Sequence, residues 1–320
     1  MEDFNQTSEV CIMRIGVLTG GGDCPGLNPV IRAVVRCAVL SGDEVIGIPN
    51  GWGGLVQGLP TMHLDLRTVS GILHRGGTIL GTSRTNPYSD KKQLKSLKEN
   101  FKTLRLDALV AIGGEDTLGV AAKLASEKYP VVGVPKTIDN DLNGTDYTFG
   151  FDTAVNIVTE AIDRLHTTAE SHSRVMVVEV MGRHAGWIAL MSGLAGGADL
   201  IIIPEFEITI DEVIDTVKKR HDRGKTFSIV VVAEGAKIKG GQLVQKSVKK
   251  DAFGHMLLGG ISHPLAKAIE KRTGFETRVT ELGHIQRGGS PTAFDRNLGT
   301  RFGVKAYELV KAKKYGYMAA

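Results

Sequence analysis

The sequence predicts an α/β fold with parallel sheets, in a chain long enough for about two domains. Short, apolar, β-rich runs alternate with amphipathic helical stretches from one end to the other, a pattern typical of βαβ units. The length of 320 residues exceeds the roughly 100 to 200 residues of an ordinary single domain. The 40 glycines, nearly twice the ~7% average frequency, gather at predicted strand ends, which indicates close approach of the backbone to a partner there.

The alternating pattern gives eight expected strands. They are Ile15–Thr19, Glu44–Ile48, Ala108–Ile112, Val131–Val134, Val175–Val180, Leu200–Ile203, Phe227–Ala233 and Thr277–Leu282. Three helices have clear start signals, and they are Asn28–Leu40 after Pro25 and Gly26, Thr117–Glu127 after Gly113 and Gly114, and Thr153–Thr168 with Asp152 as its N-cap. Because the carboxyl ends of parallel strands share one edge with the amino ends of the helices, ligands are expected at that edge.

Composition excludes several classes of protein. The net charge is only +4 and the basic residues are scattered, so nucleic-acid binding gains no support. No apolar run approaches the ~18 to 20 residues of a membrane span. The first dozen residues lack the basic start and apolar centre of a secretory signal, so we expect a frayed leader in a cytoplasmic protein. Three cysteines without a Cys-x-x-Cys pair argue against a zinc site or disulfide framework.

The first chemical motif is a glycine turn, Gly20-Gly21-Gly22, between a predicted strand and a predicted helix. Free backbone N–H groups and a helix dipole at such a turn would cradle an anion such as phosphate. The third glycine of a dinucleotide-binding motif is replaced by Pro25, and no Walker loop is present. The alternative interpretation is a tight turn without a ligand.

The second motif places two carboxylates, Glu115 and Asp116, after Gly113-Gly114 at a predicted strand end. Carboxylates in this place suggest magnesium, which prefers oxygen ligands and bridges phosphates. The alternative is that both acids only favour the amino terminus of the following helix electrostatically.

The third motif is the segment 135–141, in which Lys136, Thr137, Asp139 and Asp141 follow a predicted buried strand. Phosphoryl transfer needs a base for the acceptor hydroxyl, a cation for the transferred oxygens and donors for the developing charge. This segment could supply all three, and the alternative is a polar loop whose acids cap a turn.

Five arginines lie at predicted strand ends or in glycine-containing loops, and they are Arg84, Arg174, Arg183, Arg278 and Arg287. The planar guanidinium group binds phosphate through two parallel hydrogen bonds. Any one of them could instead form a surface ion pair, but five together indicate a multiply phosphorylated substrate.

With these motifs in place, the sequence resembles the phosphofructokinase family from about Arg14 to Tyr307. The resemblance is carried by four motifs in family order: Gly-Gly-Asp-x-Pro-Gly-x-Asn at 21 to 28, Thr-Ile-Asp-Asn-Asp at 137 to 141, Glu-Val-Met-Gly-Arg at 179 to 183 and Gly-His-x-Gln-Arg-Gly-Gly at 283 to 289. It implies the phosphofructokinase fold, with two Rossmann-like three-layer α/β domains and mostly parallel sheets. A phosphate-donor domain would comprise residues 1–150 and about 286–320, and a sugar-phosphate domain residues 151–285.

The resemblance also implies roles for individual residues. Asp139 would be the general base that takes the proton from the sugar's 1-hydroxyl, with Thr137 near the transferred group, Arg183 steadying its charge and Lys136 assisting. The donor would contact Gly21, Gly22, Arg84, Gly114, Asp116 and Lys136, with Mg2+ held by Glu115 and Asp116. Fructose 6-phosphate would contact Thr137, Asp139, Asp141, Met181, Gly182, Arg183, Glu234, His284 and Arg287. Arg174 and Arg278 would reach in from a neighbouring subunit, which implies a homotetramer or homodimer with shared sites.

Two positions predict the donor, and here they are Asp116 and Lys136, where ATP-using relatives typically carry glycine. An aspartate at 116 would fill the space of the α-phosphate and ribose of ATP and repel the α-phosphate. Lys136 would offset Asp116 and bind pyrophosphate, so pyrophosphate is the expected donor. The alternatives are an ATP-dependent 6-phosphofructokinase, a nicotinamide or lipid kinase, and a non-catalytic sugar-phosphate sensor.

Three features depart from the family pattern or leave a role open. Glu115 stands where relatives more commonly place the magnesium-binding aspartate. A further strand and helix usually follow the helix expected at 300–312, whereas the sequence ends at Ala320. Arg32, Arg36 and Arg67 resemble part of an effector pocket, although Arg32 and Arg36 could equally form a solvated helix face.

Overall fold

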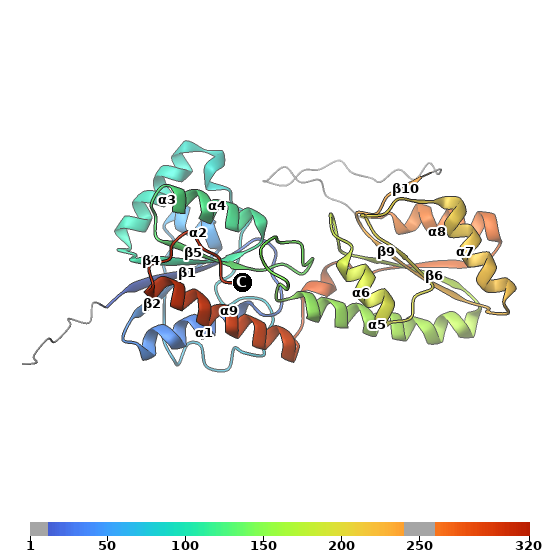
Figure 1. Ribbon diagram of the computed structural model, residues 1–320, viewed down its shortest axis with the longest axis horizontal. Coiled ribbons are helices and arrows are strands. Elements are labelled where there is room, and N and C mark those ends of the chain that lie inside the picture. The colour runs from blue at the N-terminus through green and yellow to red at the C-terminus, as the bar shows by residue number, and fades with distance from the viewer. Residues whose placement is uncertain (1–11, 240–259) are drawn as a thin grey trace, which may run out of the picture.

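Two β-sheets organise the chain in the computed structural model, which describes residues 12–239 and 260–320 (Figure 1). The expected frayed leader therefore lies almost entirely outside the described residues. The first sheet has the strand order β3-β2-β1-β4-β5. Its strands are β1 (Arg14–Gly20), β2 (Glu44–Ile48), β3 (Met62–Leu64), β4 (Ala108–Gly113) and β5 (Val131–Pro135). All neighbours pair in parallel except β2 with β3.

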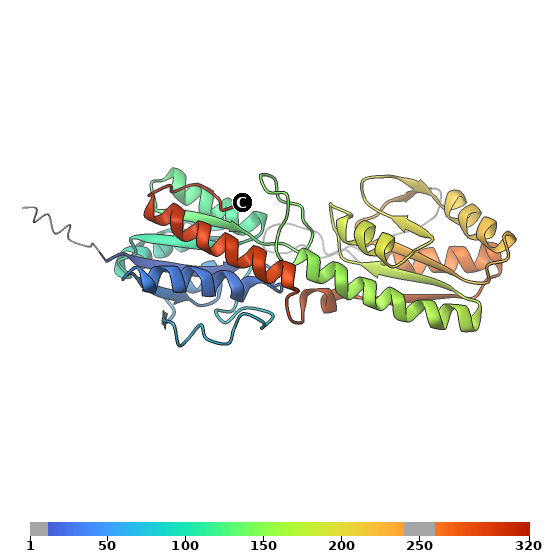
Figure 2. The same ribbon diagram turned by 60° about the horizontal axis from the view of Figure 1, so that its bottom comes forward.

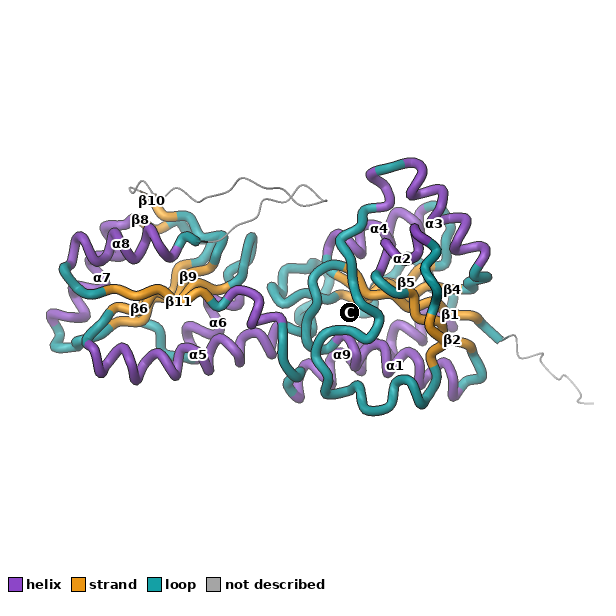
Figure 3. The backbone as a smooth tube through the Cα atoms, turned by 180° about the vertical axis from the view of Figure 1, so that it is seen from behind, coloured by secondary structure: helices purple, strands orange, loops and turns teal. Residues whose placement is uncertain are grey.

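Helices cover both faces of this sheet. The helices α1 (Leu27–Leu40) and α9 (Ala293–Lys311) lie on one face, and α2 (Gly51–Gln57), α3 (Lys91–Thr103) and α4 (Glu115–Ser126) lie on the other (Figures 1 and 3). A 3-10 turn, η1 (Pro87–Ser89), precedes α3. β4 is buried along its whole length, as expected for a central parallel strand with helices on both sides.

The second sheet is entirely parallel, with the order β11-β6-β9-β7. Its strands are β6 (Val175–Val180), β7 (Leu200–Ile202), β9 (Ser228–Ala233) and β11 (Thr277–Glu281). The helices α5 (Phe151–His172) and α6 (Trp187–Ala195) lie on one face, and α7 (Ile210–Asp222) and α8 (Ser262–Thr273) lie on the other (Figure 1). A separate parallel pair consists of β8 (Ile208–Thr209) and β10 (Ile238–Lys239). The predicted fold class, two three-layer α/β units with mostly parallel sheets, is confirmed.

The eight predicted strands are all present, with ends that differ by at most one residue. The sequence analysis missed β3, β8 and β10, because strands of two or three residues carry no periodic pattern. The prediction of Asp152 as the N-cap of α5 was wrong. Gly150 occupies that position with a left-handed backbone, and Asp152 lies in the first helical turn.

The junction between the two sheets is made by the amino ends of α5 and α9, which meet in Figure 2. The buried Asp295 carboxylate accepts hydrogen bonds from the backbone N–H of Thr153 at 2.8 Å and from its hydroxyl at 2.5 Å. The Thr292 hydroxyl donates to Asp152 at 2.6 Å. Asp295 of α9 therefore supplies an acceptor for a first-turn N–H of α5, which has no partner within its own helix, and Asp152 of α5 holds the N-cap side chain of α9.

After α9 the chain returns to the first sheet and pairs with β5. Gly316 N–H donates to the Val131 carbonyl at 2.8 Å, and Ala319 N–H donates to the Gly133 carbonyl at 2.9 Å. The edge of β5 is therefore covered by residues 316–319. Across residues 12–239 and 260–320, no helix is both long and apolar enough to cross a membrane.

Candidate active site

The carboxyl ends of β1, β4 and β5 meet at one edge of the first sheet, where the glycine turn, the start of α4 and the segment 136–141 lie together. The two strands β1 and β4 end in Gly20 and Gly113, and both pack on the buried side chain of Thr117. A Cβ atom at Gly20 would lie 2.6 Å from the Thr117 hydroxyl, and one at Gly113 would lie 2.3 Å from Thr117 Cβ. Glycine is required here because α4 begins directly against the strand ends.

The glycine turn is held by the loop that carries Arg84. Gly21 N–H donates to the Ser83 carbonyl at 3.0 Å, and the Thr82 hydroxyl donates to the Gly21 carbonyl at 2.6 Å. Arg84 follows directly and is exposed at the same edge. The predicted donor contacts Gly21, Gly22 and Arg84 are thus neighbours in space.

Lys136 is buried and its ammonium group donates a hydrogen bond to the Gly22 carbonyl. Burial lowers the pKa of Lys136, and the positive charge of Arg287 lowers it further, whereas Asp23 and Asp139 raise it. The sequence analysis expected Lys136 to offset Asp116. That expectation stays a prediction. Cys24, Arg287, Asp23 and Asp139 are the neighbours that act most strongly on the pKa of Lys136, because its side chain turns toward the glycine turn.

Asp139 combines burial with a raised pKa. Burial raises its pKa from 3.8 to about 6, and the neighbouring Asp141 raises it as well, against the lowering effects of Arg287, Lys136 and Arg183. Its Oδ1 atom is buried and accepts no hydrogen bond from any residue that the structure describes. Thr137 lies beside both acids, since its hydroxyl accepts from Asp139 N–H at 3.1 Å and donates to Asp141 at 3.2 Å. A carboxylate with a free oxygen and a pKa near 6 suits general-base catalysis near neutral pH.

The second sheet contributes the residues that follow β6 and β9. Met181, Gly182 and Arg183 follow β6, and Glu234 follows β9 with its N–H bonded to the Val180 carbonyl at 2.8 Å. Burial raises the pKa of Glu234 from 4.5 to about 7, and the charge of Asp139 raises it further, while Arg183 lowers it. The mutual electrostatic effects of Asp139, Arg183 and Glu234 indicate that the ends of the two sheets face one site.

The turn η2 (Gly283–Arg287) joins the two halves of this site. Its Gln286 side chain is fully buried, accepts from Met181 N–H at 3.2 Å and donates to the Gly283 carbonyl at 3.1 Å. Arg287 reaches the other sheet, where its guanidinium group donates to the Asp23 carbonyl at 3.4 Å. A Cβ atom at Gly22 would lie 2.7 Å from that guanidinium group, so glycine makes the approach possible. His284 is exposed on the same turn.

Arg174 and Arg278 lie elsewhere. Both form ion pairs with Glu276 at the start of the strands β6 and β11, the Arg174 pair at 2.8 Å. Met181 lies beyond the opposite end of β6, so the two groups are separated by about 20 Å at ~3.3 Å per strand residue. Within one chain the structure does not bring these two arginines to Asp139.

The predicted metal ligands, Glu115 and Asp116, occupy the first turn of α4. No group of three or more His, Cys, Asp or Glu side chains that could hold a metal ion occurs in the described part of the chain. Magnesium is commonly held by only one or two carboxylates together with substrate phosphates and water. The pair at the start of α4 therefore fits a magnesium ion that arrives with a phosphate ligand, and does not fit a permanently caged metal.

Sequence reasoning missed Gln286, Asn140 and Glu179. Glu179 is buried at the end of β6 and accepts from Ser262 N–H at 2.9 Å and from the Ser262 hydroxyl at 2.6 Å. All three stand inside the quoted motifs, beside residues with evident chemistry. A polar residue within such a motif was the signal available in the sequence, but only the folded structure shows which groups it contacts.

Comparison with known proteins finds similar sequences and a similar structure. Residues 14–310 match the family described as phosphofructokinase. The chain is 59% identical to a pyrophosphate–fructose 6-phosphate 1-phosphotransferase from Streptomyces coelicolor, over 96% of this chain and 90% of that protein. It is 54% identical to ATP-dependent 6-phosphofructokinase 3 of the same organism, with the same coverage. The structure of phosphofructokinase from Saccharomyces cerevisiae superposes with a TM-score of 0.80 at 34% identity, covering 94% of this chain and 42% of the yeast chain.

Proposed function

The chain belongs to the phosphofructokinase family, and we propose that it transfers a phosphoryl group from pyrophosphate to the 1-hydroxyl of fructose 6-phosphate. The products are fructose 1,6-bisphosphate and phosphate. The observation that carries this proposal is Asp139, a buried carboxyl group at the meeting point of the two sheets whose pKa is raised to about 6 by burial and by Asp141. The 59% identical relative named for pyrophosphate supports the choice of donor.

Asp139 acts as the general base. With a pKa of about 6 it is mostly ionised at pH 7.5, and its free Oδ1 atom is available for the proton of the attacking hydroxyl. Arg183 and Arg287, whose charges act on Asp139, stabilise the negative charge in transit. Glu234, with a pKa of about 7, lies on the sugar side of the site, where Met181, Gly182 and His284 complete the binding surface.

The donor binds against the glycine turn, Arg84 and the start of α4. Gly21, Gly22 and Gly114 offer backbone N–H groups for phosphate oxygens. Asp116, in the first turn of α4, opposes the α-phosphate of a nucleotide, and Lys136 fixes the turn by its bond to Gly22. Magnesium, held by Glu115 and Asp116, supplies charge neutralisation to the phosphate oxygens when bound.

Residues 1–150 and about 286–320 form the donor half in this proposal, and residues 151–285 form the sugar-phosphate half. Arg174 and Arg278, remote from Asp139 within one chain, serve the site of a neighbouring subunit in a homotetramer or homodimer. The free thiols of Cys24 and Cys37 fit a cytoplasmic enzyme. Pyrophosphate is a less strongly driving donor than ATP, so we expect readily reversible catalysis.

The test is an assay of the pure protein with fructose 6-phosphate and either pyrophosphate or ATP as the only donor. We expect turnover with pyrophosphate and little with ATP. Robust turnover with ATP alone would make the enzyme an ATP-dependent 6-phosphofructokinase, the activity for which the 54% identical relative is named. Thermal stabilisation by fructose 1,6-bisphosphate without any turnover would indicate a sugar-phosphate sensor.

A further inference from the structure

Asn140 stands between the two acids of the proposed catalytic segment and has an unusual backbone. Its φ angle is 51°, in the left-handed region that asparagine adopts more readily than most residues. The left-handed residue turns the chain sharply between Asp139 and Asp141. The proposed base and its acidic neighbour therefore depend on the conformation of this residue.

The side chain of Asn140 braces the loop that follows. Its Oδ1 atom accepts from Thr148 N–H at 2.8 Å, and its amide group donates to the Asp146 carbonyl at 3.3 Å. The Thr148 hydroxyl in turn donates to the Thr137 carbonyl at 2.8 Å. These bonds close residues 137–148 into one unit, with Asn140 at its centre.

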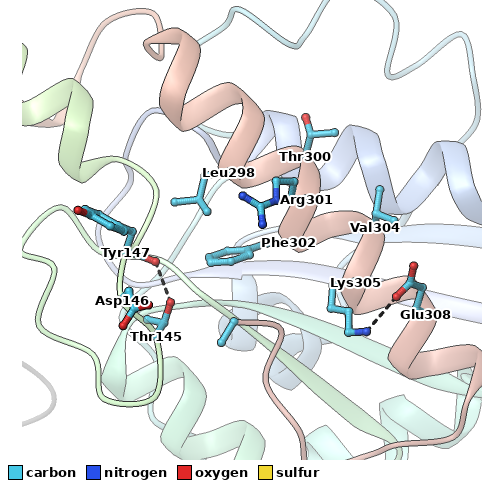
Figure 4. A pocket seen from close by; sticks show the side chains of 11 residues that line it. Thr145, Asp146, Tyr147, Leu298, Thr300, Arg301, Phe302, Val304, Lys305 and Glu308 are labelled. Atoms are coloured by element: carbon cyan, nitrogen blue, oxygen red, sulfur yellow. Dashed lines mark hydrogen bonds and ion pairs between the residues drawn. The ribbon is translucent and has the colours of Figure 1, made fainter.

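The outer side of this unit borders a cavity. Figure 4 shows Thr145, Asp146 and Tyr147 along one side of a cavity, opposite Arg301 and Phe302 of α9. The cavity has a volume of about 590 Å³, and Tyr147 is 52% exposed. Tyr147 packs edge-to-face on Phe294 of α9, with ring centroids 5.5 Å apart, and the hydrogen bonds to Asn140 hold the loop from within.

The proximity of the two acids has an electrostatic consequence. Asp141 raises the pKa of Asp139, whereas the facing Arg287, Lys136 and Arg183 lower it. The charge of Asp139 also raises the pKa of Glu234 across the site, so Glu234 is coupled to the same group of charges.

We propose that Asn140 is a positioning residue that fixes the Asp139 and Asp141 carboxylates relative to each other through its left-handed backbone and its bonds to Asp146 and Thr148. This inference rests on the proposed function for its kinetic consequence only, since the geometry itself can be measured without turnover. Asn140 touches no reacting atom in this account and acts through Asp139.

The decisive variant is Asn140→Gly, because glycine keeps the left-handed backbone accessible while removing every side-chain bond. We expect kcat to fall about 10-fold to 100-fold, with KM for fructose 6-phosphate changed less than about twofold, since only the placement of the base is disturbed. The acidic limb of the pH–rate profile should move down by about half a pH unit as Asp141 moves away from Asp139.

Two further variants calibrate the result. Lys128→Gly replaces another left-handed residue, with φ of 71°, at the end of α4 and away from the site, and should leave kcat and the pH profile unchanged. Asp141→Asn removes the neighbouring charge completely. It therefore gives the largest decrease in the pKa of Asp139 that loss of this coupling can cause.

A second readout does not require activity. The carboxyl carbon of Asp139 can be titrated by NMR in protein labelled with 13C-aspartate and assigned with Asp139→Asn, and its pKa should be lower in Asn140→Gly than in the wild type. An unchanged titration together with an unchanged kcat would overturn the inference. So would a lower kcat accompanied only by a lower melting temperature, because that is a merely structural effect. A shifted titration in a protein that turns over neither donor would uphold the positioning role and reject the proposed function.

Discussion

The buried ammonium group of Lys136 donates a hydrogen bond to the carbonyl oxygen of Gly22, and so ties the segment after β5 to the turn after β1. Asp139, which follows in the first segment, is the proposed base, and Gly21 and Gly22 in the turn are proposed to bind the donor. Lys136 therefore does more than add a positive charge, because it fixes the glycine turn, one wall of the proposed donor site, relative to the segment that carries Asp139.

The donor preference is expected to depend on Asp116 and Lys136 together. The double variant Asp116→Gly/Lys136→Gly should gain ATP-dependent turnover, because it removes the repulsion and the bulk opposed to the α-phosphate. Pyrophosphate-dependent kcat/KM should fall about tenfold or more, since the Gly22 carbonyl loses its charged partner. Steady-state assays with each donor measure both changes. Lys123→Gly, in the last turn of α4, is the matched control and should leave the donor ratio unchanged.

Replacement of the proposed base should remove catalysis without unfolding the protein. Asp139→Asn keeps the size of the side chain but cannot take the proton, so kcat should fall by about 10²-fold to 10⁴-fold. In the wild type, the rate should decline as the pH falls through about 6, where Asp139 becomes protonated. Near-normal rates in Asp139→Asn would show that another group is the base.

The same variant should be more stable than the wild type at neutral pH. The pKa of Asp139 is higher in the folded protein, about 6, than its ordinary value of 3.8, so the folded state binds this proton more tightly. The resulting penalty is absent below pH 3.8, grows as the pH rises to 6 and is fully present above it. Asp139→Asn removes the penalty, and its melting temperature should exceed the wild-type value by about 2 to 4 °C at pH 7.5. Thermal unfolding at pH 7.5 and pH 4.5 measures the difference, which should shrink at the lower pH.

Gln286 should control binding of the sugar phosphate. Gln286→Met has a similar shape but leaves the Met181 N–H without its partner, at a cost of about 1 to 3 kcal/mol for a buried donor. We expect KM for fructose 6-phosphate to rise about tenfold with a smaller change in kcat. Gln286→Glu retains an acceptor for Met181 and should recover part of the loss. Equal kinetics in all three proteins would show that the bond does not position the substrate loop.

Shared sites can be tested by mixing two inactive proteins. Asp139→Asn lacks the base, and the double variant Arg174→Ala/Arg278→Ala lacks the arginines proposed to serve the neighbouring subunit. After mild dissociation and reassembly, mixed oligomers should regain activity, because some sites combine an intact Asp139 with intact arginines. A mixture of Asp139→Asn with Arg287→Ala is the control and should stay inactive, since both residues belong to the same site in one chain. Absence of recovery in the first mixture would confine the site to a single subunit.

Local patterns were sufficient to predict most of the fold. The β-rich runs are buried on both faces by flanking helices, so their apolar character marks them strongly, and all eight expected strands were found. The N-cap of α5 was mispredicted because Asp152 has a typical capping side chain, yet Gly150 makes the left-handed turn that the chain needs there. Asp152 instead serves Thr292, a partner 140 positions away.

The sequence by itself determined the fold class, the sheet edge at which the site is expected and the residue types that could move a phosphoryl group. Only the tertiary structure decided how these residues are arranged. It turned Lys136 toward Gly22 and raised the pKa of Asp139 by burial. It also brought η2, which follows the second sheet, against the glycine turn of the first, and paired Arg174 and Arg278 with Glu276. The physical reason is that strand and helix patterns are local, whereas burial and electrostatic coupling depend on residues that only the folded chain brings together.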